Sequence, residues 1–243
     1  MRFLVVLLLV FQVNSLQADE IFNLIKIPNL EVYKIDNNQG LKYLNSKQNF
    51  IIGVKNNIKC EKANKTNLAN TFSIIERNLE KYDAKFLKKI NLRFIVLCEN
   101  LYISEINTAG IPDYKKRTLI LDINFEKKYF ERVIHHEIFH LVYDSFKEFF
   151  NDKTWSDFNK KSFKYAECST CSDRLNLDLY DNTGGFVTEY SKSIPSEDMA
   201  EVFSFLMTDK AKVEDKSDND IILKNKINFI KSSLSKIDSS FKF

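Results

Sequence analysis

The sequence predicts an α+β protein with a small mixed sheet and a mainly helical C-terminal part. Two short apolar runs, over residues 91–98 and 118–123, indicate strands. Helices are indicated where apolar residues recur at spacings of three and four, which is the period of one helix face. This pattern occurs over residues 68–87, 125–143, 196–207 and 218–237. Strands that are concentrated before a run of helices are typical of the α+β class.

The composition describes a folded globule with nearly balanced charge. The chain of 243 residues carries 36 Lys and Arg against 33 Asp and Glu, a net charge of +3. The basic residues are scattered among acidic ones, so no nucleic acid partner is indicated. The 5 Gly and 3 Pro stand against 21 Phe and 10 Tyr, which is typical of a packed core and not of linkers.

The N-terminus has the layout of a secretory signal peptide over residues 1–18. Arg2 precedes an apolar run over residues 3–11, and cleavage is expected after Ala18 or Ser15. The run is too short to span a bilayer, and a buried strand or helix is the alternative interpretation. We therefore expect a secreted or periplasmic protein without stable membrane insertion.

Four cysteines in an exported chain predict two disulfides, for which three pairings are possible. We favour Cys60 with Cys98 and Cys168 with Cys171. Closing the loop of about forty residues between Cys60 and Cys98 contributes roughly 4 kcal/mol in the chain-entropy model. The CxxC pair at Cys168 and Cys171 is also found in zinc knuckles and redox sites. No second CxxC and no spare histidine accompanies it, so a structural disulfide is favoured.

The elements of the N-terminal half follow from apolar periodicity. Residues 19–62 mix short apolar runs with Asn and Lys and indicate no function. An amphipathic helix is predicted over residues 68–87 and a buried strand over residues 91–98. Residues 110–113 (Gly-Ile-Pro-Asp) predict a turn, and a second strand follows over residues 118–123.

The C-terminal half begins with a core helix from about Phe125 or Glu126 to Tyr143. Residues 144–187 form a polar and aromatic connection without periodicity, which is typical of loops that shape a site. The next helix, over residues 196–207, has Ser196 as its N-cap candidate. An apolar stripe over residues 218–237 predicts a closing helix that packs on the domain, with a coiled coil as the alternative.

The core helix carries the motif His136-Glu137-x-x-His140, and the 3 histidines of the chain all lie between positions 135 and 140. Residues four apart share a helix face, so both motif imidazoles can bind one Zn²⁺ while Glu137 faces a metal-bound water. Buried polar groups need partners, and a metal supplies them. An ordinary core helix with satisfied histidines is the alternative. His135 is turned about 100° from His136 and is interpreted as structural.

A zinc site needs at least one further protein ligand, and no histidine remains outside the motif. The third ligand is therefore a carboxylate or a thiolate. The residues after His140 lack the glycine and third histidine of the metzincin signature, which excludes that class. Thiolate ligation by Cys168 or Cys171 conflicts with their expected oxidation outside the cell.

Glu197 is the favoured third ligand because Glu201 follows one helical turn later on the same face. In this arrangement Glu197 binds the metal, and Glu201 accepts a hydrogen bond from the far ring nitrogen of a ligating histidine, expected to be His136. Asp198 points elsewhere and is a candidate helix cap.

The order and spacing of these residues resemble the gluzincin metallopeptidases, particularly the catalytic domain of anthrax lethal factor and its relatives. The matching residues run along the chain as His136-Glu137-x-x-His140 and then Tyr190-x6-Glu197-x3-Glu201. Residues 155–165 and 185–190 are also similar to a family of secreted bacterial zinc-binding metallopeptidases. The resemblance covers about residues 65–240 and leaves residues 19–62 outside it.

This resemblance implies a zincin-like metallopeptidase domain over residues 63–243, preceded by an N-terminal segment of unknown role at 19–62. It also implies one Zn²⁺ per chain and a role for each matching residue. His136, His140 and Glu197 bind zinc, and Glu137 is the general base. Glu201 accepts a hydrogen bond from a zinc-binding histidine. Tyr190 assists the oxyanion.

The predicted function is that of a secreted zinc endopeptidase, active as a monomer on a peptide or protein substrate. The strand over residues 118–123 precedes the motif helix, where an edge strand can pair with an extended substrate backbone. One alternative is a secreted zinc-containing binding module that has lost turnover. A zinc hydrolase acting on another kind of amide is a further alternative.

Overall fold

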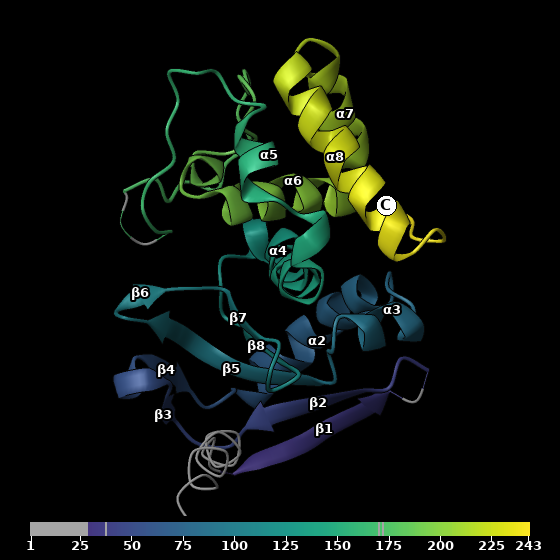
Figure 1. Ribbon diagram of the computed structural model, residues 1–243. Coiled ribbons are helices and arrows are strands. Elements are labelled where there is room, and N and C mark those ends of the chain that lie inside the picture. The colour runs from purple at the N-terminus through teal and green to yellow at the C-terminus, as the bar shows by residue number, and fades with distance from the viewer. Residues whose placement is uncertain (1–28, 37, 170, 172) are drawn as a thin grey trace, which may run out of the picture.

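The computed structural model describes residues 29–36, 38–169, 171 and 173–243 (Figure 1). The predicted signal peptide at residues 1–18 and its cleavage site lie outside these described residues. Among the described residues, no helix is long and apolar enough to cross a membrane.

The sheet is mixed and is organised around one long strand, β5. The strands in chain order are β1 (Leu30–Asp36), β2 (Leu41–Ser46), β3 (Phe50–Ile52), β4 (Ile58–Glu61), β5 (Phe94–Ile103), β6 (Ile106–Asn107), β7 (Gly110–Asp113) and β8 (Thr118–Asp122). The first half of β5 lies between β2 and β8 and is parallel to both. Its second half pairs antiparallel with β4 and β6. The strands β1 and β7 are antiparallel to β2 and β8 and close the two sides.

Seven α-helices and three short 3-10 helices are present in the part of the chain that the structure describes. They are α2 (Lys65–Leu79), α3 (Ala84–Lys89), α4 (Lys127–Ser145), α5 (Asp152–Ser156), α6 (Pro195–Thr208), α7 (Lys210–Asp218) and α8 (Ile221–Ile237), with η1 (Val54–Asn56), η2 (Lys147–Phe149) and η3 (Tyr190–Lys192). Figure 1 shows α5 to α8 on one side of α4 and the strands on the other. The prediction of an α+β fold with a mixed sheet and a helical C-terminal half is confirmed.

The prediction of a turn at residues 110–113 is wrong, because these residues form β7. Pro112 lacks a backbone N–H, and a strand at the side of a sheet tolerates such a residue. The strand expected over residues 118–123 is present as β8, but β8 lies between β5 and β7 and is not an edge. The edge strand beside the motif helix is therefore β7.

The single helix predicted over residues 68–87 is two helices. The apolar stripe continues across the break, but α2 ends at Leu79 and Asp83 caps the start of α3 by accepting a hydrogen bond from the Phe86 amide. Asn64 caps α2 in the same way. Because Leu68 and Ile75 of α2 are buried in the main core, this helix supports the sheet and α4.

The helix α4 is buried along most of its length. Ile134, Ile138 and Leu141 have no exposed surface and pack in the main core. Burying an Ile or Leu side chain contributes roughly 1.5–3 kcal/mol, so this face of α4 is firmly held. The opposite face carries the motif histidines.

The start of α6 differs from the prediction. Ile194 is the N-cap residue, Pro195 is the first helical residue, and no side chain caps the helix, so Ser196 is not the cap. Asp198 does not cap the helix either. Its Oδ2 atom accepts a hydrogen bond from Lys226 of α8 at 2.6 Å, and both side chains are fully buried.

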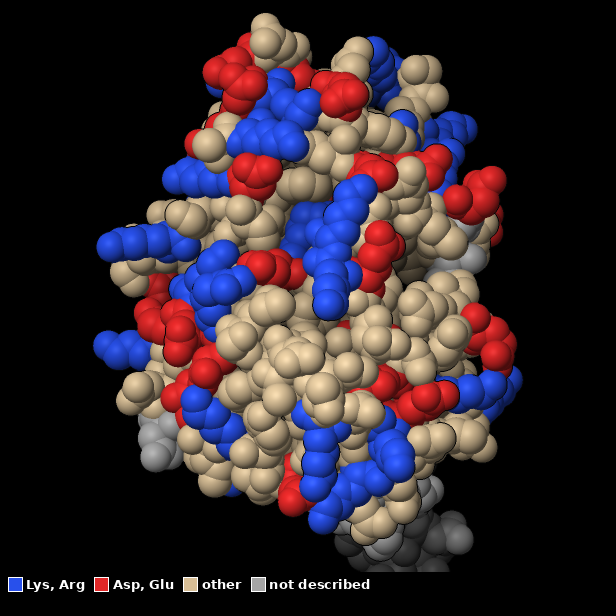
Figure 2. Space-filling model, turned by 180° about the vertical axis from the view of Figure 1, so that it is seen from behind, with Lys and Arg blue, Asp and Glu red and all other residues tan. Residues whose placement is uncertain are grey.

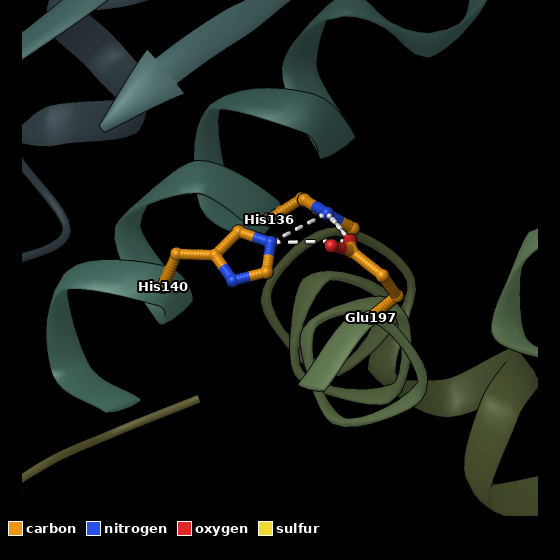
Figure 3. A group of neighbouring side chains, drawn as sticks. All are labelled: His136, His140 and Glu197. Atoms are coloured by element: carbon orange, nitrogen blue, oxygen red, sulfur yellow. Dashed lines mark hydrogen bonds and ion pairs between the residues drawn. The ribbon is translucent and has the colours of Figure 1, made fainter. Parts of the chain in front are cut away.

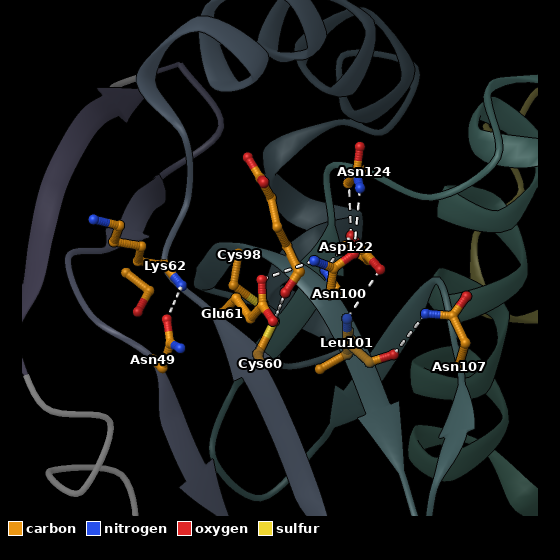
Figure 4. Close-up of a disulfide and its surroundings, with 12 residues drawn as sticks. Asn49, Cys60, Glu61, Lys62, Cys98, Asn100, Leu101, Asn107, Asp122 and Asn124 are labelled. Carbon is orange, nitrogen blue, oxygen red and sulfur yellow. Dashed lines mark hydrogen bonds between the residues drawn. A yellow bond between two sulfur atoms is a disulfide. The ribbon is translucent and has the colours of Figure 1, made fainter.

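Both predicted cysteine pairs are joined in the structure. Cys60 and Cys98 link β4 to β5, as Figure 4 shows. Beside this disulfide, the buried Asp122 carboxylate accepts hydrogen bonds from the amides of Asn100 and Leu101, which fixes the middle of β5. Cys168 and Cys171 close a short loop in the connection before α6.

Candidate metal centre

Two helices bring the three predicted ligands together. His136 and His140 project from one face of α4, and Glu197 projects toward them from the first turn of α6 (Figure 3). The Glu197 Oε2 atom lies 2.9 Å from His136 Nε2 and 3.1 Å from His140 Nε2. The two Nε2 atoms are 3.1 Å apart. The three donor atoms therefore form a nearly equilateral triangle.

The triangle fits a tetrahedral zinc ion. With metal–ligand bonds of 2.0–2.1 Å, neighbouring tetrahedral ligands are separated by roughly 3.3 Å. The observed separations are close to this value, and two imidazole nitrogens and one carboxylate are a typical zinc donor set. Within the described residues, this is the group of His, Cys, Asp or Glu side chains whose ligand atoms converge closely enough for a metal.

Behind His136, the Glu201 carboxylate fixes the orientation of the ring. Its Oε1 atom lies 2.9 Å from His136 Nδ1. Its Oε2 atom accepts hydrogen bonds from Arg132 at 2.6 Å and from Thr188 at 2.7 Å. With Nδ1 donating to Glu201, the Nε2 lone pair of His136 is free to bind a metal. The sequence alone does not indicate Arg132 and Thr188, because neither lies in the motif or at a recognisable spacing from it.

The charges of the site are strongly coupled. Burial alone would lower the pKa of His136, but its contacts with Glu197 and Glu201 outweigh this and raise it to about 10. Burial would raise the pKa of Glu197, but the charges of His140 and His136 hold it well below its usual range. The protein chain alone therefore favours a charged imidazole and charged carboxylates at this position.

Glu137 lies beside the three ligand residues and lines the same cleft. Its side chain is 7% exposed, and burial raises its pKa to about 7. Gly110 of β7 packs directly against it, since a Cβ atom there would be 2.6 Å from Glu137 Cγ. A glycine is therefore needed at this point of the edge strand.

Tyr190 lies in η3, the short 3-10 helix that precedes α6. Its ring centroid is 5.9 Å from that of His136, and the residue lines the cleft. Burial and the charges of Glu197 and Glu137 raise its pKa well above the usual range, so the phenol remains a hydrogen-bond donor at neutral pH.

The cleft around these groups has largely apolar walls. They come from the β5–β6 hairpin, β7, the segment around the start of α4, and the connection before α6. The apolar lining residues are Ile103, Ile106, Ala109, Ile111, Pro112, Phe125, Val133, Leu175 and Leu177.

His135 points away from the triangle into the core. It has no exposed surface, and its two ring nitrogens lie 2.6 Å from the Tyr82 hydroxyl and 2.9 Å from Asn78 Oδ1. Burial, together with Lys81, lowers the pKa of His135 to about 3, so it is a neutral side chain between α4 and α2.

The cysteines are also separate from the triangle of ligands. Cys168 and Cys171 are bonded to each other, which removes the thiolate alternative for the third ligand.

A family of known proteins matches more than half of the chain. This family, described as "putative zinc-binding metallo-peptidase", matches residues 84–237. Among solved structures, the fold is similar to that of a protein from Bacteroides caccae described in the same words, with 19% sequence identity and a TM-score of 0.47. The similarity covers 70% of this chain and 69% of that chain. A search of the curated proteins finds no match.

Proposed function

Because the chain belongs to this family of zinc-binding metallopeptidases, we propose that it is a secreted zinc-dependent endopeptidase of the gluzincin type. The observation that carries the proposal is the meeting of His136, His140 and Glu197 at one point, with the Glu137 carboxylate beside them. A structural zinc site has no use for a carboxylate base next to its ligands, whereas hydrolysis requires one. We propose one zinc ion per chain.

Each residue of the site has a distinct task in the proposed reaction. Bound zinc supplies Lewis-acid chemistry, which lowers the pKa of water and polarises a carbonyl group. Glu137 accepts the proton of the attacking water at its carboxylate and returns it to the leaving nitrogen. Burial raises the pKa of Glu137 to about 7 in the protein chain alone, so its carboxyl group can accept and release a proton near neutral pH. Tyr190 donates its hydroxyl hydrogen to the oxygen on which charge develops.

We propose that β7 binds the substrate backbone. It is the edge strand next to Glu137, and Gly110 brings it within contact distance of that side chain. An extended peptide can add to such an edge through main-chain hydrogen bonds, so recognition requires no particular sequence at those positions. The substrate is accordingly a peptide or protein.

The two disulfides support export of the protein, since such bonds persist in oxidising compartments. We propose that residues 1–18 direct this export and that residues 63–243 form the catalytic unit of a monomer. Strands β1 to β4, within residues 30–61, belong to the same sheet as β5 and complete it.

Metal content tests the first half of the proposal. Purified protein is expected to contain about one zinc per chain by elemental analysis. Glu197→Gln is expected to lose most of this zinc. Asp144→Asn, which changes an exposed carboxylate at the rim of the cleft, serves as the matched control and is expected to retain it. Equal retention in the two variants places the third ligand elsewhere.

Cleavage of a diverse peptide library tests the second half. Glu137→Gln is expected to hold zinc and lower kcat by about 10²–10⁴, because it removes the proton acceptor. Tyr190→Phe is expected to lower kcat by roughly 10² with little change in KM. A wild-type protein that binds zinc but cleaves nothing instead supports a zinc-containing binding module without turnover.

A further inference from the structure

We propose that Arg132 is a positioning residue for both the metal site and the substrate cleft, an inference that rests on the proposed function. Arg132 lies one helical turn before His136 in α4 and is 7% exposed. Its Nη1 atom donates to Glu201 Oε2 at 2.6 Å, and its Nη2 atom donates to the Leu177 carbonyl at 2.7 Å. One guanidinium group thus connects Glu201, which holds the ring of His136, with the wall of the cleft at Leu177.

Arg132 balances charge at the site. Three buried carboxylates meet at the site, those of Glu137, Glu197 and Glu201. When both histidines are neutral and bind zinc, the charge of the ion leaves about one negative charge uncompensated. Uncompensated charge is strongly unfavourable in a buried position, and the Arg132 guanidinium, which stays charged in proteins, neutralises it. Arg132 therefore contributes to the charge balance of the zinc-bound site, although it contacts none of the atoms that bind the metal.

On the metal side, Arg132 helps to fix the orientation of the His136 ring through Glu201. Glu201 holds the His136 ring through Oε1, so any rotation of the carboxylate turns the ring. Arg132 and Thr188 both donate to Oε2 and prevent this rotation. The guanidinium itself lies over the Phe205 ring at 4.5 Å, so it is packed as well as hydrogen-bonded.

On the cleft side, Arg132 holds the backbone at Leu177. The Leu177 side chain lines the cleft, and its carbonyl is held by Arg132. The adjacent residue, Asn176, accepts a hydrogen bond from the Tyr190 amide at 3.1 Å. Arg132 therefore fixes the short segment that both forms a wall and supports the chain at Tyr190. Lysine carries the same charge but a single nitrogen without the rigid fork, so it cannot reproduce both contacts at once.

Four variants separate these contributions. Arg132→Lys keeps the positive charge but loses the second donor nitrogen of the guanidinium group. Arg132→Gln loses the charge as well. Thr188→Val removes the other donor to Glu201 without touching Leu177. Arg77→Lys is the matched control: it makes the same substitution in an exposed ion pair with Glu131, the residue beside Arg132. Thermal unfolding of each zinc-free variant establishes that it is folded.

The main measurement is zinc affinity by competition with a chelator, which requires no turnover. We expect Arg132→Lys to bind zinc about 10-fold more weakly, Arg132→Gln about 10²-fold more weakly, and Arg77→Lys like the wild type. The visible spectrum of the Co²⁺-loaded protein is expected to change in both Arg132 variants, because the His136 ring moves. Folded Arg132 variants with zinc affinity within twofold of the wild type and an unaltered Co²⁺ spectrum would overturn the proposal.

Kinetics test the cleft side. KM is expected to rise several-fold in Arg132→Lys and to rise less in Thr188→Val, since only the former releases the Leu177 wall. Equal KM values in these two variants refute the cleft role of Arg132. If the wild type binds zinc and cleaves no peptide, the peptidase proposal fails, while the zinc affinities still decide the role of Arg132 in the metal site.

Discussion

At the scale of single residues, the distance between β7 and the Glu137 side chain depends on the absence of a Cβ atom at Gly110. An added Cβ would lie 2.6 Å from Glu137 Cγ and 3.3 Å from the Ile120 carbonyl oxygen. The backbone of Ile120 belongs to a central strand pair and cannot easily move, so Glu137 must yield.

We predict that Gly110→Ala lowers kcat/KM by about 10-fold to 10²-fold, because a catalytic group is displaced by a fraction of an ångström or more. Zinc content is expected to remain at the wild-type level, since Glu137 is not a ligand. Activity assays and elemental analysis on the same preparation measure both effects. Undiminished activity would show that the carboxylate does not act from the position described here.

Zinc uptake is predicted to release protons. The pKa of His136 in the chain alone is about 10, so this imidazole is charged at pH 7 and must lose its proton to bind a metal. Roughly one proton per zinc is therefore expected from His136 at pH 7, and the apparent affinity falls as the pH is lowered. Calorimetric titration in two buffers with different ionisation enthalpies measures this number. A buffer-independent heat would contradict the assignment.

The sequence identified residues whose roles depend on local spacing. His136 and His140 are four apart, and Glu197 and Glu201 are four apart, so each pair must share a helix face whatever the rest of the fold does. Arg132 and Thr188 were not predicted because their contacts join segments distant in sequence. The closeness of Gly110 to Glu137 depends on strand order, which no local pattern encodes.

At the scale of elements, α6 is held to α8 by the buried Asp198–Lys226 pair. Asp198 Oδ2 also accepts hydrogen bonds from Trp155 and Tyr165, and Lys226 donates to the Gly185 carbonyl. Burial raises the pKa of Asp198 and lowers that of Lys226, and each partner opposes the shift of the other. The pair thus fixes the first turn of α6, where Glu197 lies.

We predict that Lys226→Met lowers the free energy of unfolding by about 3–5 kcal/mol, because it leaves the Asp198 carboxylate buried without its cation. Adding Asp198→Leu is expected to recover part of this loss, since no charge then remains buried. Lys153→Met is the control: it breaks an exposed pair with Asp157 and is expected to change stability by less than about 1 kcal/mol. Urea unfolding measures all three, and equal effects at Lys226 and Lys153 would refute the prediction.

Local sequence patterns do not predict all the boundaries of the helices and strands. The stripe over residues 68–87 continues across two helices because both bury their apolar face in one core, so periodicity alone could not locate the break at Asp83. Pro112 indicated a turn, although a strand edge accommodates it. The helix α7 is mostly exposed and has a weak apolar stripe, and it was not predicted.

At the scale of the whole molecule, charges of both signs are mixed on the face shown in Figure 2. Figure 2 shows Lys and Arg interspersed with Asp and Glu over the face in view, together with an uncharged area. This agrees with the net charge of +3 and with the proposed recognition of substrate in the cleft, without long-range electrostatic attraction.

The two disulfides are predicted to contribute unequally to stability. Cys60 and Cys98 are separated by 38 residues, and Cys168 and Cys171 by 3. In the chain-entropy model the longer loop contributes about 4 kcal/mol and the shorter about 2 kcal/mol. Replacing each pair by serines and measuring urea unfolding tests this order. A larger loss for the Cys168/Cys171 double variant would contradict it.

The order of the two disulfides along the chain also bears on how the protein matures. The first cysteine of the chain is bonded to the second and the third to the fourth, so the two loops neither overlap nor enclose one another. In the proposed export, an oxidant that joins cysteines in the order in which they emerge would produce the native pairs directly, without shuffling of mixed or crossed bonds. Cys60 and Cys98 both precede α4 in sequence, so the bond between β4 and β5 could form before the helix that carries His136 and His140 has emerged.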